Sequence, residues 1–173
     1  MSEKSGAVTF KGSPLTLVGD YVRVGERAPD FVALASDLSQ VKLSEYAGKT
    51  IVLVSVPSLD TPVCDTEARR FNEEAAALGR NIQVLVVSMD LPFAQARWCG
   101  AAGIENVKTL SDHRDEAFGR AYGVLIEELR LLARAVWVVD PEGTVSHAEL
   151  VAEIADEPDY DAAIAAARKA AAQ

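Results

Sequence analysis

The sequence lacks the features of a secreted, membrane-embedded or nucleic-acid-binding protein. It has only 2 cysteines in 173 residues, too few for a disulfide scaffold. The 17 Lys and Arg residues are outnumbered by 26 Asp and Glu, and the resulting net charge of −9 argues against nucleic-acid or anionic-membrane partners. No apolar run approaches the roughly 18 residues of a membrane span, and the first residues lack the apolar core of a secretory signal. We therefore expect a folded, cytoplasmic protein without nucleic-acid or membrane partners.

The length predicts one domain, residues 1–173. Metal binding is disfavoured because Cys64, Cys99, His113 and His147 are far apart and form none of the tight pairs that organise a zinc site. In a reducing compartment the two cysteines are then either redox-active or buried and inert.

Apolar periodicity predicts strands that alternate with helices. Residues 50–56 and 82–88 are aliphatic runs typical of strands buried on both faces, whereas residues 64–78 carry an apolar stripe of helical spacing. Further expected elements are a hairpin within residues 1–20, short extended pieces at 31–35 and 41–43, a helical turn at 44–47, helices at 92–100, 115–122 and from 158, and strands at 107–110, 134–139 and 144–151. This order is typical of an α/β, thioredoxin-like fold: a mixed central sheet flanked by helices, with an N-terminal β-hairpin extension.

The segment Pro57-Ser-Leu-Asp-Thr61-Pro-Val-Cys64 lies between the first buried strand and the first long helix. Open α/β sheets usually build their sites in such loops, after the carboxyl ends of strands. Cys64 stands at a helix start, where unpaired N–H groups and the helix dipole stabilise an anionic sulfur. We therefore predict a thiolate that is readily approached from solvent.

Several side chains can act on that sulfur. The hydroxyl of Thr61 can turn toward the sulfur or toward an oxygen bound beside it, and Pro57 stiffens the loop. Asp65 and Glu67 oppose a thiolate by like-charge repulsion, so a cation must outweigh them. We choose Arg134, because an arginine in an otherwise apolar strand needs a partner anion.

Simpler interpretations of the same residues stay open. Cys99 alone can be a small core residue, at the end of a helix closed by Gly100. Thr61 can be a turn or cap residue, and Arg134 can pair with an acid at a sheet edge.

Taken together, the motifs resemble those of one known family. Pro57-x-x-x-Thr61-x-x-Cys64 resembles the peroxidatic motif of peroxiredoxins, and the wider segment is similar to their thiol peroxidase subgroup, the atypical two-cysteine class. Asp90-Leu-Pro-Phe-Ala-Gln-Ala-Arg-Trp-Cys99 matches the subgroup's resolving-cysteine helix, and Ala133-Arg-Ala-Val136 and Glu157-Pro-Asp-Tyr160 extend the similarity over nearly the whole chain. Val56 and Asp65 depart from the pattern.

The resemblance implies a thiol-dependent peroxidase. Cys64 is then the peroxidatic cysteine, Thr61 orients the hydroperoxide, Arg134 holds the charge, and Pro57 screens the pocket from water. Cys99 resolves the sulfenic acid to an intramolecular disulfide, which a thioredoxin-like partner reduces. The resemblance implies no metal or organic cofactor. It does imply a homodimer that forms near the active-site loops.

The positions of the two cysteines predict a conformational change. A disulfide needs Cα atoms within about 7 Å, so we expect a turn around each cysteine to unwind before Cys64 and Cys99 can bond.

Three rival functions remain open. They are a dithiol oxidoreductase, which would need a C-x-x-C motif, a cysteine hydrolase using His113 or His147, and a non-catalytic thiol redox sensor or partner-binding module.

Overall fold

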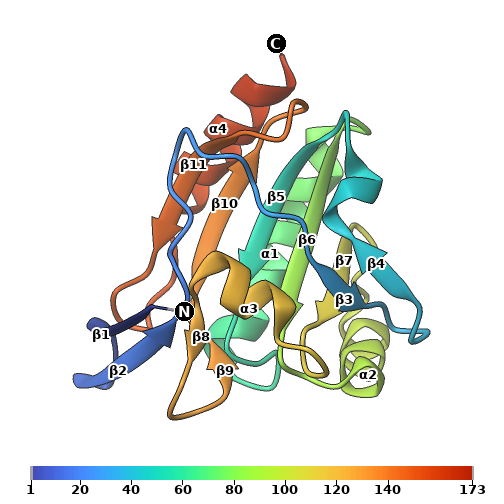
Figure 1. Ribbon diagram of the computed structural model, residues 1–173. Coiled ribbons are helices and arrows are strands. Elements are labelled where there is room, and N and C mark those ends of the chain that lie inside the picture. Colours follow the sequence, from blue (N-terminus) through green and yellow to red (C-terminus); the bar gives the residue numbers. More distant parts are fainter. Residues whose placement is uncertain (1, 173) are drawn as a thin grey trace.

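A seven-stranded mixed sheet forms the centre of the molecule in this computed structural model, which describes residues 2–172 (Figure 1). The strand order is β11-β10-β5-β6-β7-β3-β4. The strands are β3 (Val32–Leu34), β4 (Gln40–Lys42), β5 (Thr50–Ser55), β6 (Ile82–Ser88), β7 (Val107–Ser111), β10 (Ala135–Val139) and β11 (Val145–Leu150). The predicted α/β class with a mixed, helix-flanked sheet is confirmed, while residues 1 and 173 of the predicted domain lie outside the described part.

The three strands in the middle of the sheet, β5, β6 and β7, run parallel to one another. All six residues of β5 are buried, as expected for an aliphatic strand covered on both faces. The carboxyl ends of β5 and β6 therefore open at the same edge of the sheet, and each leads into a helix.

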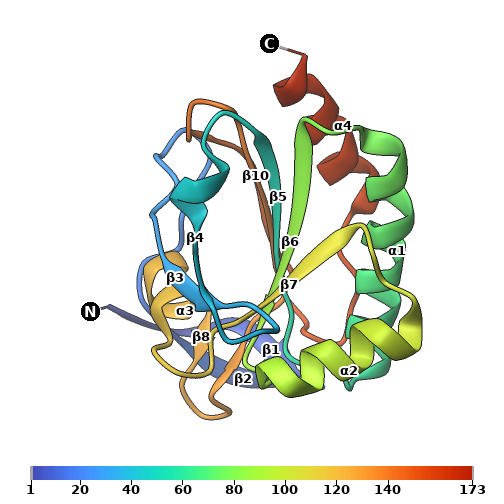
Figure 2. The same ribbon diagram turned by 90° about the vertical axis from the view of Figure 1, so that its right-hand side faces the viewer.

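Helices cover both faces of the sheet (Figure 2). On one face lie α1 (Pro62–Leu78) and α4 (Tyr160–Ala171), which contribute Ala68, Phe71, Ala163 and Ala167 to the core. On the other lies the short α3 (Ala117–Tyr122), whose Phe118 and Tyr122 pack with Phe31 and Trp137. The helix α2 (Pro92–Ala102) packs near β7, and a 3-10 turn, η1 (Leu43–Tyr46), precedes β5.

The predicted N-terminal hairpin is present as β1 (Glu3–Phe10) and β2 (Ser13–Val18). Lys11 and Gly12 at its turn both have positive φ, 49° and 83°, as a two-residue turn of the right twist requires. The hairpin belongs to a second sheet, completed by β8 (Leu125–Ile126) and β9 (Leu131–Leu132). These two strands were not predicted, because two-residue strands carry no periodic signal.

The hairpin also reaches the chain that follows β11. The Thr9 N–H donates to the carbonyl of Ala152 at 2.8 Å, and the Ile154 N–H donates to the carbonyl of Thr9 at 2.9 Å. The first strand is therefore fixed directly beside the segment around Ile154.

The predicted end of α2 was wrong. The helix does not close at Gly100 but continues to Ala102, where Gly103 adopts the left-handed conformation at φ 68° and its N–H bonds the Cys99 carbonyl. Cys99 therefore lies inside the last turn rather than at a free end.

Candidate active site

Cys64 is the third residue of α1, directly beyond the loop that leaves β5. Thr61 precedes the helix in an extended conformation and Pro62 occupies its first position, where a missing N–H costs nothing. The first intrahelical bond runs from the Asp65 N–H to the Thr61 carbonyl, at 3.0 Å. The N–H groups of Val63 and Cys64 therefore have no partner within the helix and point toward its start.

The Cys64 sulfur is not exposed, which corrects the expectation of a thiol open to solvent. Its side chain is fully buried in the cluster formed by α1, α4 and the central sheet. The helix does present the sulfur at its N-terminus as predicted, but Val56 and Leu59 from the loop side belong to the same buried cluster. In this state the sulfur therefore lies in the interior of the protein.

Arg134 lies beside that sulfur. It directly precedes β10 rather than standing within it, and is almost completely buried. Its Nη2 donates to the Cys64 sulfur at 3.2 Å and to the Ile154 carbonyl at 2.8 Å, and its Nε donates to the same carbonyl at 3.1 Å. The structure thus brings together the cation and the sulfur that the sequence analysis paired.

Glu67 completes the group, and its role was not predicted. One turn beyond Cys64, it forms a buried ion pair with Nη1 of Arg134. Burial raises the pKa of Glu67 to about 7, although Arg134 opposes the rise. Burial alone would lower the pKa of Arg134, but Glu67 and Cys64 outweigh it and raise that pKa, so the guanidinium stays charged. The i, i+3 spacing of Cys64 and Glu67 on a helix was the available signal.

Asp65, the other acid expected to oppose a thiolate, turns away from the sulfur. Its two carboxylate oxygens accept hydrogen bonds from Trp98 Nε1 at 2.7 Å and from Arg69 Nε at 2.9 Å. Both acids beside Cys64 therefore have cationic or N–H partners of their own.

The loop before α1 is held in place by its own polar groups. Pro57 is buried at the start of the loop. The Thr61 hydroxyl is exposed and donates to the Ser58 carbonyl at 2.9 Å, so its oxygen keeps lone pairs that can accept a hydrogen bond from a ligand. This differs from a hydroxyl aimed at the sulfur.

Asp90 anchors the same loop and was missed by sequence reasoning. Its carboxylate accepts from the Ser58 hydroxyl at 2.7 Å, the Leu59 N–H at 2.8 Å and the Ser88 hydroxyl at 2.7 Å. Asp90 links the carboxyl end of β6 to the loop that follows β5. Its position just after a buried strand was the only available signal.

Cys99 lies in a different setting. It is partly exposed in α2, and its sulfur is 3.6 Å from the Thr109 hydroxyl. Both cysteines are free thiols. Each is held within a helix, so the structure describes the reduced protein before any disulfide forms.

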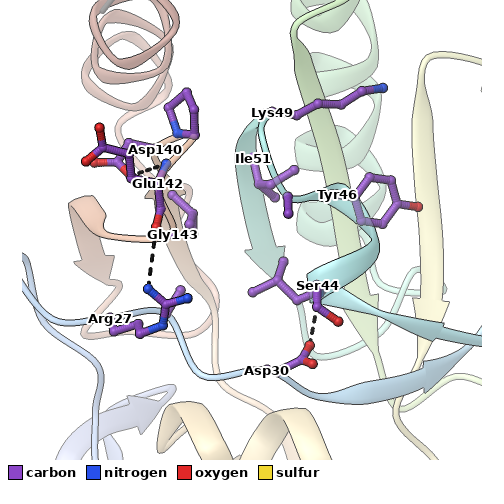
Figure 3. Close-up of a pocket in the computed structure, with 14 residues that line it drawn as sticks. Arg27, Asp30, Ser44, Tyr46, Lys49, Ile51, Asp140, Glu142 and Gly143 are labelled. Carbon is purple, nitrogen blue, oxygen red and sulfur yellow. Dashed lines mark hydrogen bonds between the residues drawn. The ribbon is translucent and has the colours of Figure 1, made fainter.

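A pocket of about 280 Å³ lies at the other end of the central sheet, between the start of β5 and the end of β10 (Figure 3). Neither cysteine lines it. Two of its charged groups bond within the protein: Asp30 accepts from the Ser44 N–H at 3.0 Å, and Arg27 donates to the Glu142 carbonyl at 3.5 Å. The pocket is therefore separate from the cysteine chemistry.

The described residues form neither a cluster suited to a metal ion nor a helix suited to a membrane. Over residues 2–172, no group of three or more His, Cys, Asp or Glu side chains is arranged to hold a metal ion. No helix in the described part of the chain is both long and apolar enough to span a bilayer.

Comparison with known proteins identifies the family of this chain. Residues 23–164 match the Redoxin family. This chain belongs to the redoxin family. Among its relatives are a thiol peroxidase of Halalkalibacterium halodurans, 57% identical over 95% of this chain and 98% of the relative, and one of Bacillus subtilis, 55% identical over 93% and 96%.

The solved structures agree with this assignment. A peroxiredoxin-like protein from Aquifex aeolicus has a TM-score of 0.88 and 45% identity, and the match covers 94% of this chain and 95% of that one. The predicted thioredoxin-like fold and the predicted resemblance to thiol peroxidases are confirmed. This redoxin is a thiol-dependent peroxidase of the peroxiredoxin type.

Proposed function

We propose that Cys64 reduces hydrogen peroxide and organic hydroperoxides and that Cys99 resolves the product. The observation that carries this proposal is the Arg134 guanidinium 3.2 Å from the Cys64 sulfur, with both side chains buried. A fixed cation in such a site favours the thiolate and the negative charge that develops as the O–O bond breaks.

The first step consumes one hydroperoxide. The Cys64 thiolate attacks the terminal oxygen, the O–O bond breaks, and the departing oxygen takes a proton to leave as water or an alcohol. Cys64 becomes a sulfenic acid. The free N–H groups of Val63 and Cys64 and the guanidinium of Arg134 stabilise the departing charge, while the Thr61 oxygen accepts a hydrogen bond from the O–H of the bound hydroperoxide, which keeps its proton on the transferred oxygen.

The second step forms the intramolecular disulfide. The Cys99 sulfur attacks the Cys64 sulfur and the sulfenic oxygen leaves as water. Because both cysteines lie within helices, the first turn of α1 and the last turn of α2 unwind on the way. A thioredoxin-like dithiol then reduces the disulfide by exchange, and no metal or organic cofactor takes part.

The proposed function extends to the domain organisation, compartment and oligomeric state of the protein. Residues 1–173 act as one domain in the cytoplasm, and the protein forms a homodimer near the active-site loops. Leu91 and Phe93, 51% and 66% exposed at the start of α2, supply an apolar surface beside the Asp90-anchored loop that such a dimer would cover.

Peroxide consumption with thioredoxin and thioredoxin reductase tests the assignment. Wild type is expected to turn over, Cys64→Ser to lose all activity, and Cys99→Ser to undergo the first oxidation without being recycled. Normal turnover by Cys64→Ser would reject the peroxidatic role. Wild type that oxidises once and is never recycled would favour a redox sensor instead.

A further inference from the structure

A hydrogen bond joins the neighbours of the two cysteines. Trp98, which precedes Cys99 in α2, donates from Nε1 to Oδ1 of Asp65, which follows Cys64 in α1, at 2.7 Å. We propose that this Asp65–Trp98 latch holds both cysteine-bearing turns in helical form and sets the rate at which Cys99 reaches the oxidised Cys64. The inference rests on the proposed roles of the two cysteines and names two positioning residues for the second step.

A third side chain supports both ends of the latch. Arg69, one turn along α1, donates from Nε to Oδ2 of Asp65 at 2.9 Å. Its guanidinium carbon lies 5.9 Å from the centre of the Trp98 ring, and its Nη1 is 3.5 Å from the carbonyl of Ala102, the last residue of α2. The contact therefore extends from the first turn of α1 to the end of α2.

The same face of α1 continues this polar seam. Asn72, at helical spacing from Asp65 and Arg69, accepts hydrogen bonds from the N–H groups of Asn106 at 2.8 Å and Glu105 at 3.3 Å. The seam is partly open to solvent, with the side chains of Asp65 and Arg69 34% and 47% exposed. Such a seam opens more readily than the apolar core beneath it.

Disulfide formation requires this latch to break. The Cys99 sulfur attacks the Cys64 sulfur, the S–O bond of the sulfenic acid breaks, and the oxygen leaves as water with the Cys99 proton. Unwinding the turn around Cys64 carries Asp65 away, and unwinding the turn around Cys99 carries Trp98 away. The latch therefore stabilises the helical form of the sulfenic acid and slows its resolution without touching the reacting sulfur.

A slower second step has a chemical consequence. While the sulfenic acid persists, a second hydroperoxide can oxidise it to the sulfinic acid, releasing a second water or alcohol. The strength of the latch therefore sets the share of turnovers that end in inactivation at high peroxide concentration.

Trp98→Phe is the cleanest test, because it removes the N–H donor and keeps an aromatic ring beside Arg69. Reduced protein is mixed with hydrogen peroxide, quenched with acid, alkylated, and resolved by mass spectrometry into thiol, sulfenic acid, disulfide and sulfinic acid. We expect the conversion of sulfenic acid to disulfide to be about tenfold faster, the size of one hydrogen bond to a charged group. Sulfenic acid formation is unchanged, and less sulfinic acid accumulates.

Asp65→Ala tests the same bond from the other helix, also in case Trp98→Phe folds poorly. If both substitutions act through one hydrogen bond, the double variant resolves no faster than the faster single variant. Arg97→Ala is the matched control, since Arg97 is an exposed neighbour of Trp98 on α2, and it should resolve at the wild-type rate.

The two levels of the proposal fail differently. Resolution by Trp98→Phe and Asp65→Ala at or below the wild-type rate, or gains that multiply in the double variant, would overturn the latch alone. Sulfenic acid that accumulates in wild type without any disulfide between Cys64 and Cys99 would overturn the resolving role of Cys99, and the latch with it.

Discussion

The two cysteines of this redoxin occupy opposite kinds of environment. Cys64 is fully buried, with a guanidinium at 3.2 Å and a buried ion pair behind it. Cys99 is partly exposed near the end of α2, with only the Thr109 hydroxyl near its sulfur among the described contacts. The difference indicates that the chemistry of the first cysteine is prepared in the folded state, whereas the second needs only to be reachable. Substitutions around Cys64 should therefore have large effects on stability and on the first oxidation, and those around Cys99 small effects on both.

The largest effect is expected from Arg134→Met. It leaves Glu67 buried without its partner, which should cost about 3–5 kcal/mol of unfolding free energy. It also removes the cation from the reacting sulfur, so the rate of sulfenic acid formation should fall about 10²–10³-fold. Chemical denaturation and single-turnover oxidation measure the two effects.

The double variant Arg134→Met/Glu67→Met separates them. Replacing both charges with apolar side chains should restore much of the stability, because no uncompensated charge remains. The oxidation rate should stay low. If the rate recovers together with the stability, Arg134 supports the fold rather than the chemistry.

Glu67 is expected to give the next largest effect, seen as a pH dependence of stability. Its folded pKa of about 7 lies above the ordinary 4.5, so the folded protein binds its proton more tightly than the unfolded chain does. Its stabilising contribution is complete below pH 4.5 and is lost as the pH rises through 7, a change of about 3 kcal/mol. Glu67→Gln should remove this slope in denaturation curves recorded from pH 4.5 to 8, and an unchanged slope would contradict the assignment.

A smaller effect is expected from Asp90→Ala, which acts on Cys64 only through the loop. The Ser58 hydroxyl and the Leu59 N–H lose their acceptor, at a cost of about 1–3 kcal/mol. The loosened loop should slow the first oxidation about tenfold, the rate equivalent of about 1.4 kcal/mol. Stopped-flow oxidation provides the measurement, and a first step at the wild-type rate would show that the anchor does not position the site.

The smallest effect is expected from Cys99→Ser on the unfolding free energy and on the rate of the first oxidation. A partly exposed side chain with one weak contact should change the unfolding free energy by less than about 0.5 kcal/mol. The first oxidation should proceed at the wild-type rate. A large loss in either measurement would show that Cys99 also shapes the Cys64 site, and the contrast between the two cysteines would no longer hold.

The sequence predicted the parts of the fold whose signal is local. The aliphatic runs became β5 and β6 within a residue of their expected ends, because a strand buried on both faces must be apolar throughout. The proline-bracketed loop led correctly to a helix with Cys64 in its first turn. The choice of Arg134 was also possible, since a lone charge in an otherwise apolar run of the sequence requires a partner, although Arg134 directly precedes the strand.

The remainder depends on tertiary contacts. The pairing of Glu67 with Arg134 joins residues far apart in the chain, and periodicity places Glu67 on a helix without saying what it faces. The expectation of an exposed sulfur failed because Cys64 is buried in a cluster that also includes residues of α4 and of the central sheet, whose packing the local sequence pattern does not reveal. The strands β8 and β9 exist because β2 provides an edge for them to pair with.

The carbonyl of Ile154 accepts two hydrogen bonds from Arg134, and the N–H of the same residue donates to Thr9 in the first strand. The amino-terminal hairpin therefore helps to hold the Arg134 guanidinium in position through Ile154, although it lies far from Cys64 in the sequence. Trimming the chain to residues 23–164, the region that matches the family, would remove this support and disturb Arg134. A bulky tag attached before the first strand would have the same effect, so an assay of either altered protein would not report the native arginine.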